Sequence, residues 1–251
     1  MVTVYDVIIF ILFMLCSYML GNISIARIIT TRNNKKGITK EGSGNPGTMN
    51  MLRTYGFAFA VFTFVTDAIK GFIPALIGLL YYGSYCGVEM AQIASMVFGL
   101  CAVLGHTFPI IYKFKGGKGI ATTFGIFVVL DPIATLITFA IMFVIFYVIK
   151  LGSVISMVVI LSLGLYNTLT VLSGNIIAIL VIWTVIVLDV YLHKKNFVRL
   201  IEDRENSADM SKAIESDISK LQHSVDKQNV ESKEEKVETP KKDNKKEESD
   251  K

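Results

Sequence analysis

The chain has 251 residues, of which 52 % are hydrophobic and 18 % charged, and its mean hydropathy is +0.53. Soluble domains carry about 25 % charged residues. This composition therefore excludes a soluble globular enzyme, a nucleic-acid-binding module and a disulfide-stapled secreted domain. Residues 206–251 contain 10 of the 25 basic residues and 12 of the 21 acidic residues. The first 205 residues are therefore more apolar than the average of the chain and carry a net positive charge.

Seven apolar runs follow one another along the chain, and a membrane-spanning helix needs about 20 such residues. The fourth run is too short to span unaided, so we expect it to pack against its neighbours. No basic residue precedes the first run, which we interpret as an uncleaved transmembrane helix rather than a signal peptide. The sequence predicts an all-α polytopic membrane protein with seven transmembrane helices, near residues 5–26, 56–82, 91–112, 119–131, 133–149, 153–172 and 175–192.

The basic residues predict an orientation in the membrane. Residues 1–205 contain 15 Lys and Arg, and 14 of them fall in connections on one side of the seven-span arrangement. The opposite side carries Asp6, Glu89 and Asp131 instead. Basic connections face the cytoplasm, so we expect the N-terminus outside and the C-terminus in the cytoplasm.

The fifteenth basic residue, Lys70, lies inside the second run, one helical turn from Asp67. An ionisable residue at this depth is costly and faces the interior of the bundle. Two interpretations stay open here, namely a buried ion pair that fixes helix packing and a positive charge that points into a polar cavity.

Residues 206–251 differ from the rest of the chain because they are rich in Lys, Glu, Asp and Ser. Such a composition buries too little apolar surface to offset the entropy of ordering. We therefore divide the chain into a transmembrane domain, residues 1–205, and a disordered charged cytoplasmic tail, residues 206–251. Removal of the tail is expected to leave activity nearly intact.

Polar residues, glycines and bases gather in three segments of the basic side, residues 42–56, 105–125 and 193–205. Glycine lets the backbone approach a ligand closely, Arg presents a fork of donors that matches phosphate, and helix N-termini favour anions. Each segment alone has an ordinary explanation as a helix cap or a topology signal. Their coincidence predicts a site for an anionic ligand at the cytoplasmic membrane surface. Neither a P-loop, a serine nucleophile motif nor metal-ligand spacing occurs.

The three segments resemble the bacterial membrane acyl-phosphate:glycerol-3-phosphate acyltransferases. Family patterns G-S-G-N-x-G-x-x-N-x-x-R, G-H-x-F-P-x-x-x-x-F-K-G-G-K-G-x-A-T and H-x-x-N-x-x-R-L match residues 42–53, 105–122 and 193–200 in order. Asp67-x-x-Lys70-Gly71 is similar to a further family feature. The resemblance implies transfer of a fatty acyl group from acyl phosphate to the 1-hydroxyl of glycerol 3-phosphate, which gives lysophosphatidic acid and phosphate.

The same resemblance implies a multi-pass enzyme of the cell membrane with its active site on the cytoplasmic face. Such an enzyme is expected to need no cofactor, metal or nucleic acid, and to receive its donor from a separate acyl-phosphate-forming enzyme. The phosphate of acyl phosphate is expected at Lys115, Lys118 and the amides of Gly116, Gly117 and Gly119. Glycerol 3-phosphate is expected at Arg53, with Lys70 or Arg199. Further substrate-binding residues implied by the motifs are Ser43, Gly44, Asn45, Asn50, Thr122 and Ser153.

Candidate catalytic residues are His106, His193 and Asn196. The general base stays open between His106, His193 and the phosphate of the substrate itself. A transporter of a phosphorylated small molecule is the alternative function, which the short fourth run and Lys70 would also suit. A membrane scaffold is a third interpretation.

Overall fold

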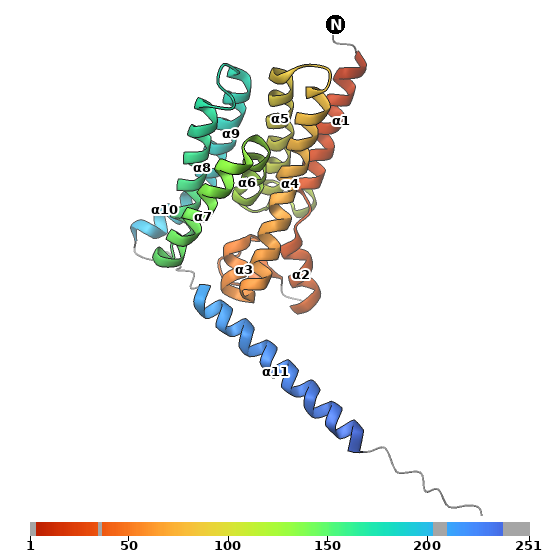
Figure 1. Cartoon of the computed structure of the whole chain (residues 1–251), viewed down its shortest axis with the longest axis vertical. Helices are drawn as coiled ribbons and strands as arrows, with labels where there is room; N and C mark the ends of the chain where they lie inside the picture. The colour runs from red at the N-terminus through yellow and green to blue at the C-terminus, as the bar shows by residue number, and fades with distance from the viewer. Residues whose placement is uncertain (1–3, 35–36, 203–209, 238–251) are drawn as a thin grey trace, which may run out of the picture.

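The computed structural model describes residues 4–34, 37–202 and 210–237, and all regular secondary structure in these ranges is helical (Figure 1). The helices are α1 (Val4–Gly21), α2 (Ile25–Asn34), α3 (Thr48–Tyr55), α4 (Phe57–Gly83), α5 (Val88–Thr107), α6 (Ile120–Leu130), α7 (Pro132–Ile149), α8 (Gly152–Leu169), α9 (Ile176–Leu192), α10 (Lys194–Ile201) and α11 (Met210–Val237), with 3₁₀ turns at Ile38–Lys40 and Ile110–Tyr112.

Each of the seven predicted apolar runs forms a helix, namely α1 and α4 to α9. Among the described residues, five helical stretches are long and apolar enough to cross a membrane, and α9 with α10, bent by 46°, would make a sixth. Helix α6 has only 11 residues. The helical architecture with several apolar helices is therefore confirmed, whereas the count of seven spans stays a prediction.

Two of the polar residues between the apolar runs act as helix caps. Asp131 precedes Pro132 at the start of α7, and its Oδ1 accepts a hydrogen bond from the Ala134 amide at 2.9 Å. Asn175 starts α9 in the same way, with 3.2 Å between its Oδ1 and the Ala178 amide. Asp and Asn satisfy the unpaired amides of a first turn, and Pro suits its first position. These two caps explain why α7 and α9 begin where the sequence predicts.

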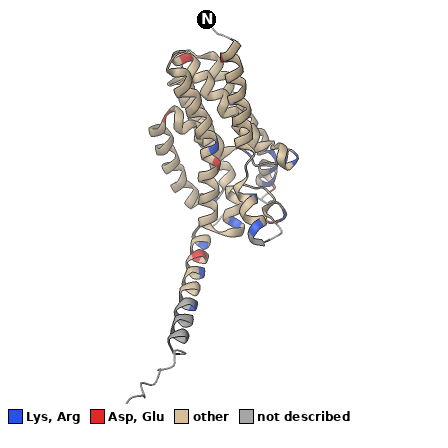
Figure 2. Cartoon of the chain, turned by 90° about the vertical axis from the view of Figure 1, so that its right-hand side faces the viewer, with Lys and Arg blue, Asp and Glu red and all other residues tan. Residues whose placement is uncertain are grey.

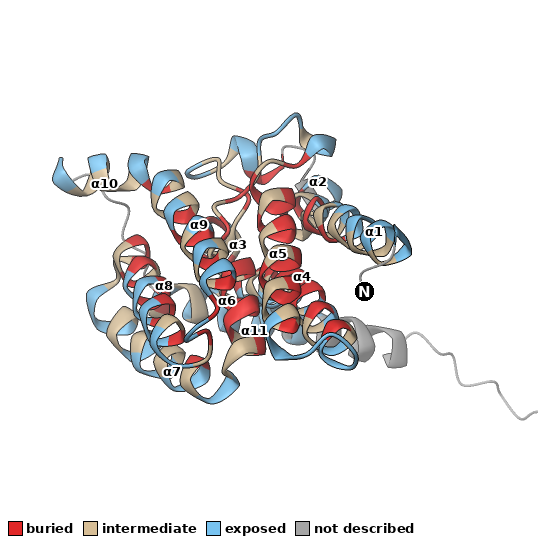
Figure 3. Cartoon of the chain, turned by 90° about the horizontal axis from the view of Figure 1, so that it is seen from above, coloured by how far each residue is buried: buried red, intermediate tan, exposed pale blue. Residues whose placement is uncertain are grey.

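Helix α4 packs against both α5 and α6, and glycines bring it close to α6. A Cβ added at Gly71 of α4 would overlap the Thr122 carbonyl, and one added at Gly125 of α6 would overlap the Ala68 carbonyl. Small residues allow such close approach in membrane bundles. Figure 3 shows buried residues on the inward faces of α4, α5 and α6, and exposed residues along α1 and α7. The short α6 is thus packed inside the bundle, as expected.

Charged residues are distributed unevenly along the bundle (Figure 2). Lys and Arg gather at the end that carries α2 and α3, whereas the N-terminus lies at the other end. A separation of this kind is what a membrane protein with one basic face requires. The orientation of that face toward the cytoplasm stays a prediction.

The tail differs from the expected absence of regular structure, because Met210–Val237 forms the long helix α11. This stretch contains neither Gly nor Pro and is rich in the strong helix formers Lys and Glu. Its first part packs against α3 and α4, and the rest extends away from the bundle (Figure 1). The expected domain boundary after residue 205 and residues 238–251 lie outside the described residues.

Candidate functional site

A cavity of about 1080 Å³ lies at the basic end of the bundle, between the three polar segments and helices α4 and α6 to α9. Helices α3 and α10 and the loops before α3 and α6 supply its polar wall. It is lined by every predicted site residue except Lys70 and Thr122, that is by Ser43, Gly44, Asn45, Asn50, Arg53, His106, Lys115, Gly116, Gly117, Lys118, Gly119, Ser153, His193, Asn196 and Arg199.

Asn50 shapes the first of the three segments. Its side chain is buried, its Oδ1 accepts from the Ser43 amide at 2.8 Å, and its Nδ2 donates to the Glu41 carbonyl at 3.0 Å. Nδ2 also donates to the Ile38 carbonyl at 3.3 Å. The amide of Asn50 therefore folds the loop that presents Ser43 and Asn45 to the cavity.

The glycines of the second segment pack on the end of α5. The Gly116 amide donates to the Thr107 carbonyl at 3.1 Å, and the Gly117 amide donates to the His106 carbonyl, also at 3.1 Å. A Cβ at Gly117 would overlap the imidazole of His106. The expectation that both amides bind phosphate therefore needs correction, because these donors hold the loop against α5.

His106 and Lys70 belong to one buried polar cluster around Asp67. The ammonium of Lys70 lies 2.5 Å from Asp67 Oδ1, and His106 Nδ1 lies 3.7 Å from the same oxygen. Gly117 covers the Nε2 side of the imidazole. For Lys70, the structure shows the ion pair, so the geometry does not place its ammonium at a substrate phosphate. Thr122 is also turned away from the cavity and lies at the contact between α4 and α6.

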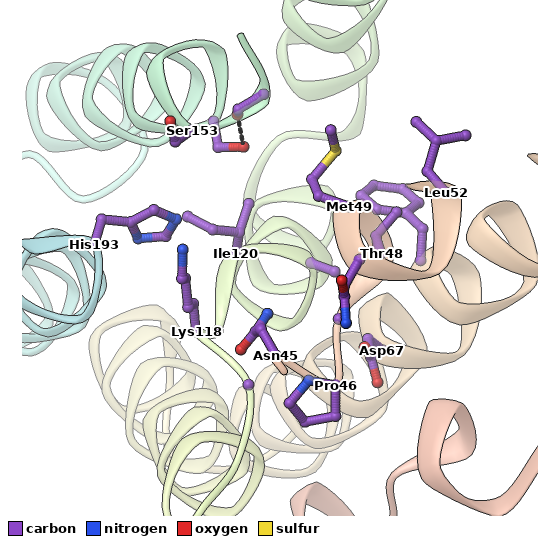
Figure 4. A pocket seen from close by; sticks show the side chains of 18 of the residues that line it. Asn45, Pro46, Thr48, Met49, Leu52, Asp67, Lys118, Ile120, Ser153 and His193 are labelled. Carbon is purple, nitrogen blue, oxygen red and sulfur yellow. Dashed lines mark hydrogen bonds between the residues drawn. The ribbon is translucent and has the colours of Figure 1, made fainter. Parts of the chain in front are cut away.

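The third segment brings positive charge together at Asn196. Lys118 Nζ donates to Asn196 Oδ1, and Arg199 Nη2 donates to the same oxygen at 3.2 Å. Two cations from separate elements, the loop before α6 and helix α10, thus share one acceptor. Figure 4 shows Lys118, His193, Asn45 and Ser153 arranged around one space. An anion in this space would meet several donors together.

A hydrogen bond to the backbone of α9 fixes the tautomer of His193. Its Nδ1 lies 2.8 Å from the Asp189 carbonyl oxygen. A carbonyl only accepts, so the neutral imidazole carries its proton on Nδ1, and its Nε2 is an acceptor. His193 is buried and lines the cavity.

Asp189 does not line the cavity but supports its wall from beneath, and the sequence analysis missed it. Its side chain is fully buried, and its Oδ2 accepts from the Thr123 hydroxyl at 2.8 Å. A Cβ at Gly119 would overlap its Oδ1, so the carboxyl group lies beneath the start of α6. The signal was present, since an acid in an apolar run is rare and Asp189 precedes His193 by one helical turn.

Arg27 is a second missed residue, because it counted only as a topology signal. Its Nη2 donates to the Lys115 carbonyl, and its guanidinium lies 4.5 Å from the centroid of the Tyr112 ring. Such stacking on an aromatic face stabilises a cation. Arg27 thereby ties the second segment to α2, and it lines the cavity beside that segment.

The cavity has a basic part and an apolar part. Asp67 is the one acid among the described lining residues, and it is paired with Lys70. The bases that line the cavity are Arg27, Arg53, Lys115, Lys118, Lys194, Lys195 and Arg199. The apolar part includes Val61, Phe64, Phe124, Phe127, Phe139, Met142, Phe143 and Phe146. This combination suits a ligand with an anionic head and a long apolar chain.

Comparisons with known proteins agree with this chemistry. A family model described as glycerol-3-phosphate acyltransferase matches residues 11–203. A glycerol-3-phosphate acyltransferase of Finegoldia magna is 33 % identical over 189 residues, which cover 75 % of this chain and 91 % of that protein. One of Endomicrobium trichonymphae is 34 % identical over 196 residues, which cover 78 % and 94 %.

Two solved structures are also similar to this fold. They are crystal structures of PlsY, an integral membrane glycerol 3-phosphate acyltransferase, in a glycerol 3-phosphate form and a lysophosphatidic acid form. Both are 29 % identical to this chain, with TM-scores of 0.70 and 0.69. The glycerol 3-phosphate form aligns over 79 % of this chain and 94 % of its own. The chain therefore belongs to the glycerol-3-phosphate acyltransferase family.

Proposed function

We propose that this protein transfers a fatty acyl group from acyl phosphate to the 1-hydroxyl of glycerol 3-phosphate. The observation that carries the proposal is the cavity itself, which joins seven basic side chains to an apolar wall of aromatic residues. Family membership makes it an acyltransferase of phospholipid synthesis and speaks against a transporter or a scaffold.

The acyl carbon of an acyl phosphate is already activated, because an acyl phosphate is a mixed anhydride. The site therefore needs to hold two phosphates together and to orient one hydroxyl. We assign the donor phosphate to Lys118, with Lys115 and the start of α6, and the acceptor phosphate to Arg53 and Arg199. Asn45, Ser43 and Ser153 supply further donors around the same space.

The proton of the attacking hydroxyl needs an acceptor. His193 Nε2 is the protein group that we assign, because the bond to the Asp189 carbonyl holds the imidazole in the required tautomer. His106 is less suited, since Gly117 covers it. A general base contributes about 10²–10⁴ in rate, so His193→Gln should lower kcat by a factor in this range. If His193→Gln kept nearly full kcat, the donor phosphate would be the better candidate for accepting the proton.

The reaction is tested with the purified protein in detergent, a long-chain acyl phosphate and glycerol 3-phosphate. We expect lysophosphatidic acid and inorganic phosphate to form in equal amounts. Parallel samples receive the same acyl group on coenzyme A or acyl carrier protein. Product with either of these and none with acyl phosphate would contradict the donor assignment. We propose that a separate enzyme forms the long-chain acyl phosphate.

We further propose that the basic end of the bundle faces the cytoplasm. In a cysteine-free variant that lacks Cys16, Cys86 and Cys101, Ser84→Cys and Ser173→Cys should react with a membrane-impermeant maleimide on intact cells. Lys40→Cys should react only after permeabilisation. All three positions are exposed on the protein surface, so the side of the membrane on which each lies decides whether the maleimide reaches it. Labelling of Lys40→Cys on intact cells would overturn the orientation.

A further inference from the structure

Helix α11 contributes a residue to the substrate cavity, although it lies beyond the part of the chain that the family model matches. Met210, its first residue, is only 5 % exposed and lines the cavity. One turn later, Ala213 packs against a buried apolar cluster that contains Ala26, Met51 and Ala60. The start of α11 is therefore packed into the enzyme.

Two polar contacts attach this part of α11 to α4 and to α7, which lie on opposite sides of the cavity. Asp217 Oδ2 accepts from the Ala58 amide in the first turn of α4 at 3.1 Å. The Ser211 hydroxyl lies 3.4 Å from the hydroxyl of Tyr147, near the end of α7. Helix α11 thus connects the beginning of α4 with the end of α7.

The contact with α4 has the chemistry of a helix cap. Gly56 stands at the N-cap position of α4 and has no side chain with which to cap it. The first amides of a helix lack partners within the helix, and a carboxylate there also interacts favourably with the helix dipole. Asp217 supplies this missing acceptor from a helix that is distant in sequence.

The apolar part of the cavity lies between the two helices that α11 connects. Val61 and Phe64 of α4 line it on one side, and Phe139, Phe143 and Phe146 of α7 line it on the other. Met210, which lines the same cavity, begins α11, and α11 packs against α3 and α4 at the basic end of the bundle (Figure 1). A long, unbranched thioether is well suited to contact a flexible alkyl chain.

We propose that α11 forms part of the acyl-donor site, in which Met210 contacts the acyl chain and Asp217 is a positioning residue that holds Met210 there by capping α4. The proposal rests on the proposed function for the identity of the ligand. It replaces the expectation that the tail is dispensable.

The test uses the full chain in lipid nanodiscs and two measurements. One is the Kd of a long-chain alkylphosphonate, an unreactive analogue of the donor, and the other is KM for each substrate. Met210→Ala should raise the alkylphosphonate Kd and the acyl phosphate KM about tenfold, since a methylene-sized contact in an apolar pocket is worth about 10–200-fold. KM for glycerol 3-phosphate should stay unchanged.

Variants of Asp217 separate positioning from contact. Asp217→Ala should reproduce the Met210→Ala shift, whereas Asp217→Asn should stay close to the parent protein because Asn caps helices as well as Asp. Leu221→Ala, on the exposed side of the same helix, is the matched control and should change nothing. An unchanged Kd in Met210→Ala, or an equal shift in Leu221→Ala, would overturn the proposal.

The two readouts keep this proposal distinct from the proposed function. If the parent protein formed no lysophosphatidic acid, the proposed function would fail, yet a Kd that depends on Met210 would still show that α11 borders the chain site. If the parent protein were fully active and all variants bound the alkylphosphonate equally, only the role of α11 would fail.

Discussion

Replacing Lys118 by methionine should lower kcat/KM about a hundredfold. Lys118 shares Asn196 Oδ1 with Arg199 and reaches the space that His193, Asn45 and Ser153 surround. A hydrogen bond to a charged group is worth about 1.5–3 kcal/mol, and methionine keeps most of the side-chain volume. Under the proposed assignment, Lys118 holds the donor phosphate and the neighbouring Arg199 holds the acceptor phosphate, so Lys118 would stabilise charge near both in the transition state and the loss should appear mainly in kcat.

The control for Lys118 is Lys113→Met in the same loop. Lys113 is exposed and does not line the cavity. Lys113→Met removes the same charge as Lys118→Met, and the activity of this variant should stay within about twofold of the parent protein. Phosphate release is measured with both substrates varied. If Lys118→Met kept its kcat, or if Lys113→Met lost as much activity, general electrostatic attraction would explain the role of the loop better than a bound phosphate.

Asp67→Ala should destabilise the fold by about 3–5 kcal/mol, because it leaves the buried Lys70 ammonium without its carboxylate. His106, 3.7 Å from the same carboxylate, would lose a neighbour as well. Marginally stable proteins tolerate few losses of that size. With Cys16 and Cys86 replaced by Ser, reaction of the buried Cys101 with a fluorogenic maleimide reports thermal unfolding.

The double variant Asp67→Leu with Lys70→Met is the matched control for this prediction. Removal of both charges often restores or even improves stability, whereas removal of one charge leaves the other uncompensated. The double variant should therefore unfold close to the temperature of the parent protein. If it unfolded as early as Asp67→Ala, the ion pair would contribute through the shape of the cluster rather than through its charge.

Most of the bundle was predictable because hydrophobic length and helix caps are local properties. Asp131 and Asn175 mark helix starts in the sequence and cap α7 and α9 in the structure. Helix α11 was missed because its composition suits either a disordered chain or a helix, and the contact of Asp217 with α4 joins residues distant in sequence.

The site residues were predictable as a set, since they lie in three recognisable segments, but their individual contacts were not. Spacing shows that Gly116 and Gly117 are flexible and close to lysines. It does not show that their amides are bonded to the end of α5. Asp189 looked like part of an apolar run, because its partner Thr123 comes from another helix.

The short α6 has a consequence for the kinetics of such an enzyme. Helix α6 has only 11 residues, and α4 and α7 also border the apolar part of the cavity; both carry apolar side chains on the exposed surface of the bundle. Under the proposed function, the acyl chain arrives sideways from the bilayer, while glycerol 3-phosphate arrives from water. The enzyme then responds to the mole fraction of its donor in a two-dimensional phase and to the molarity of its acceptor in a three-dimensional one. Adding inert lipid would dilute one substrate and leave the other unaffected.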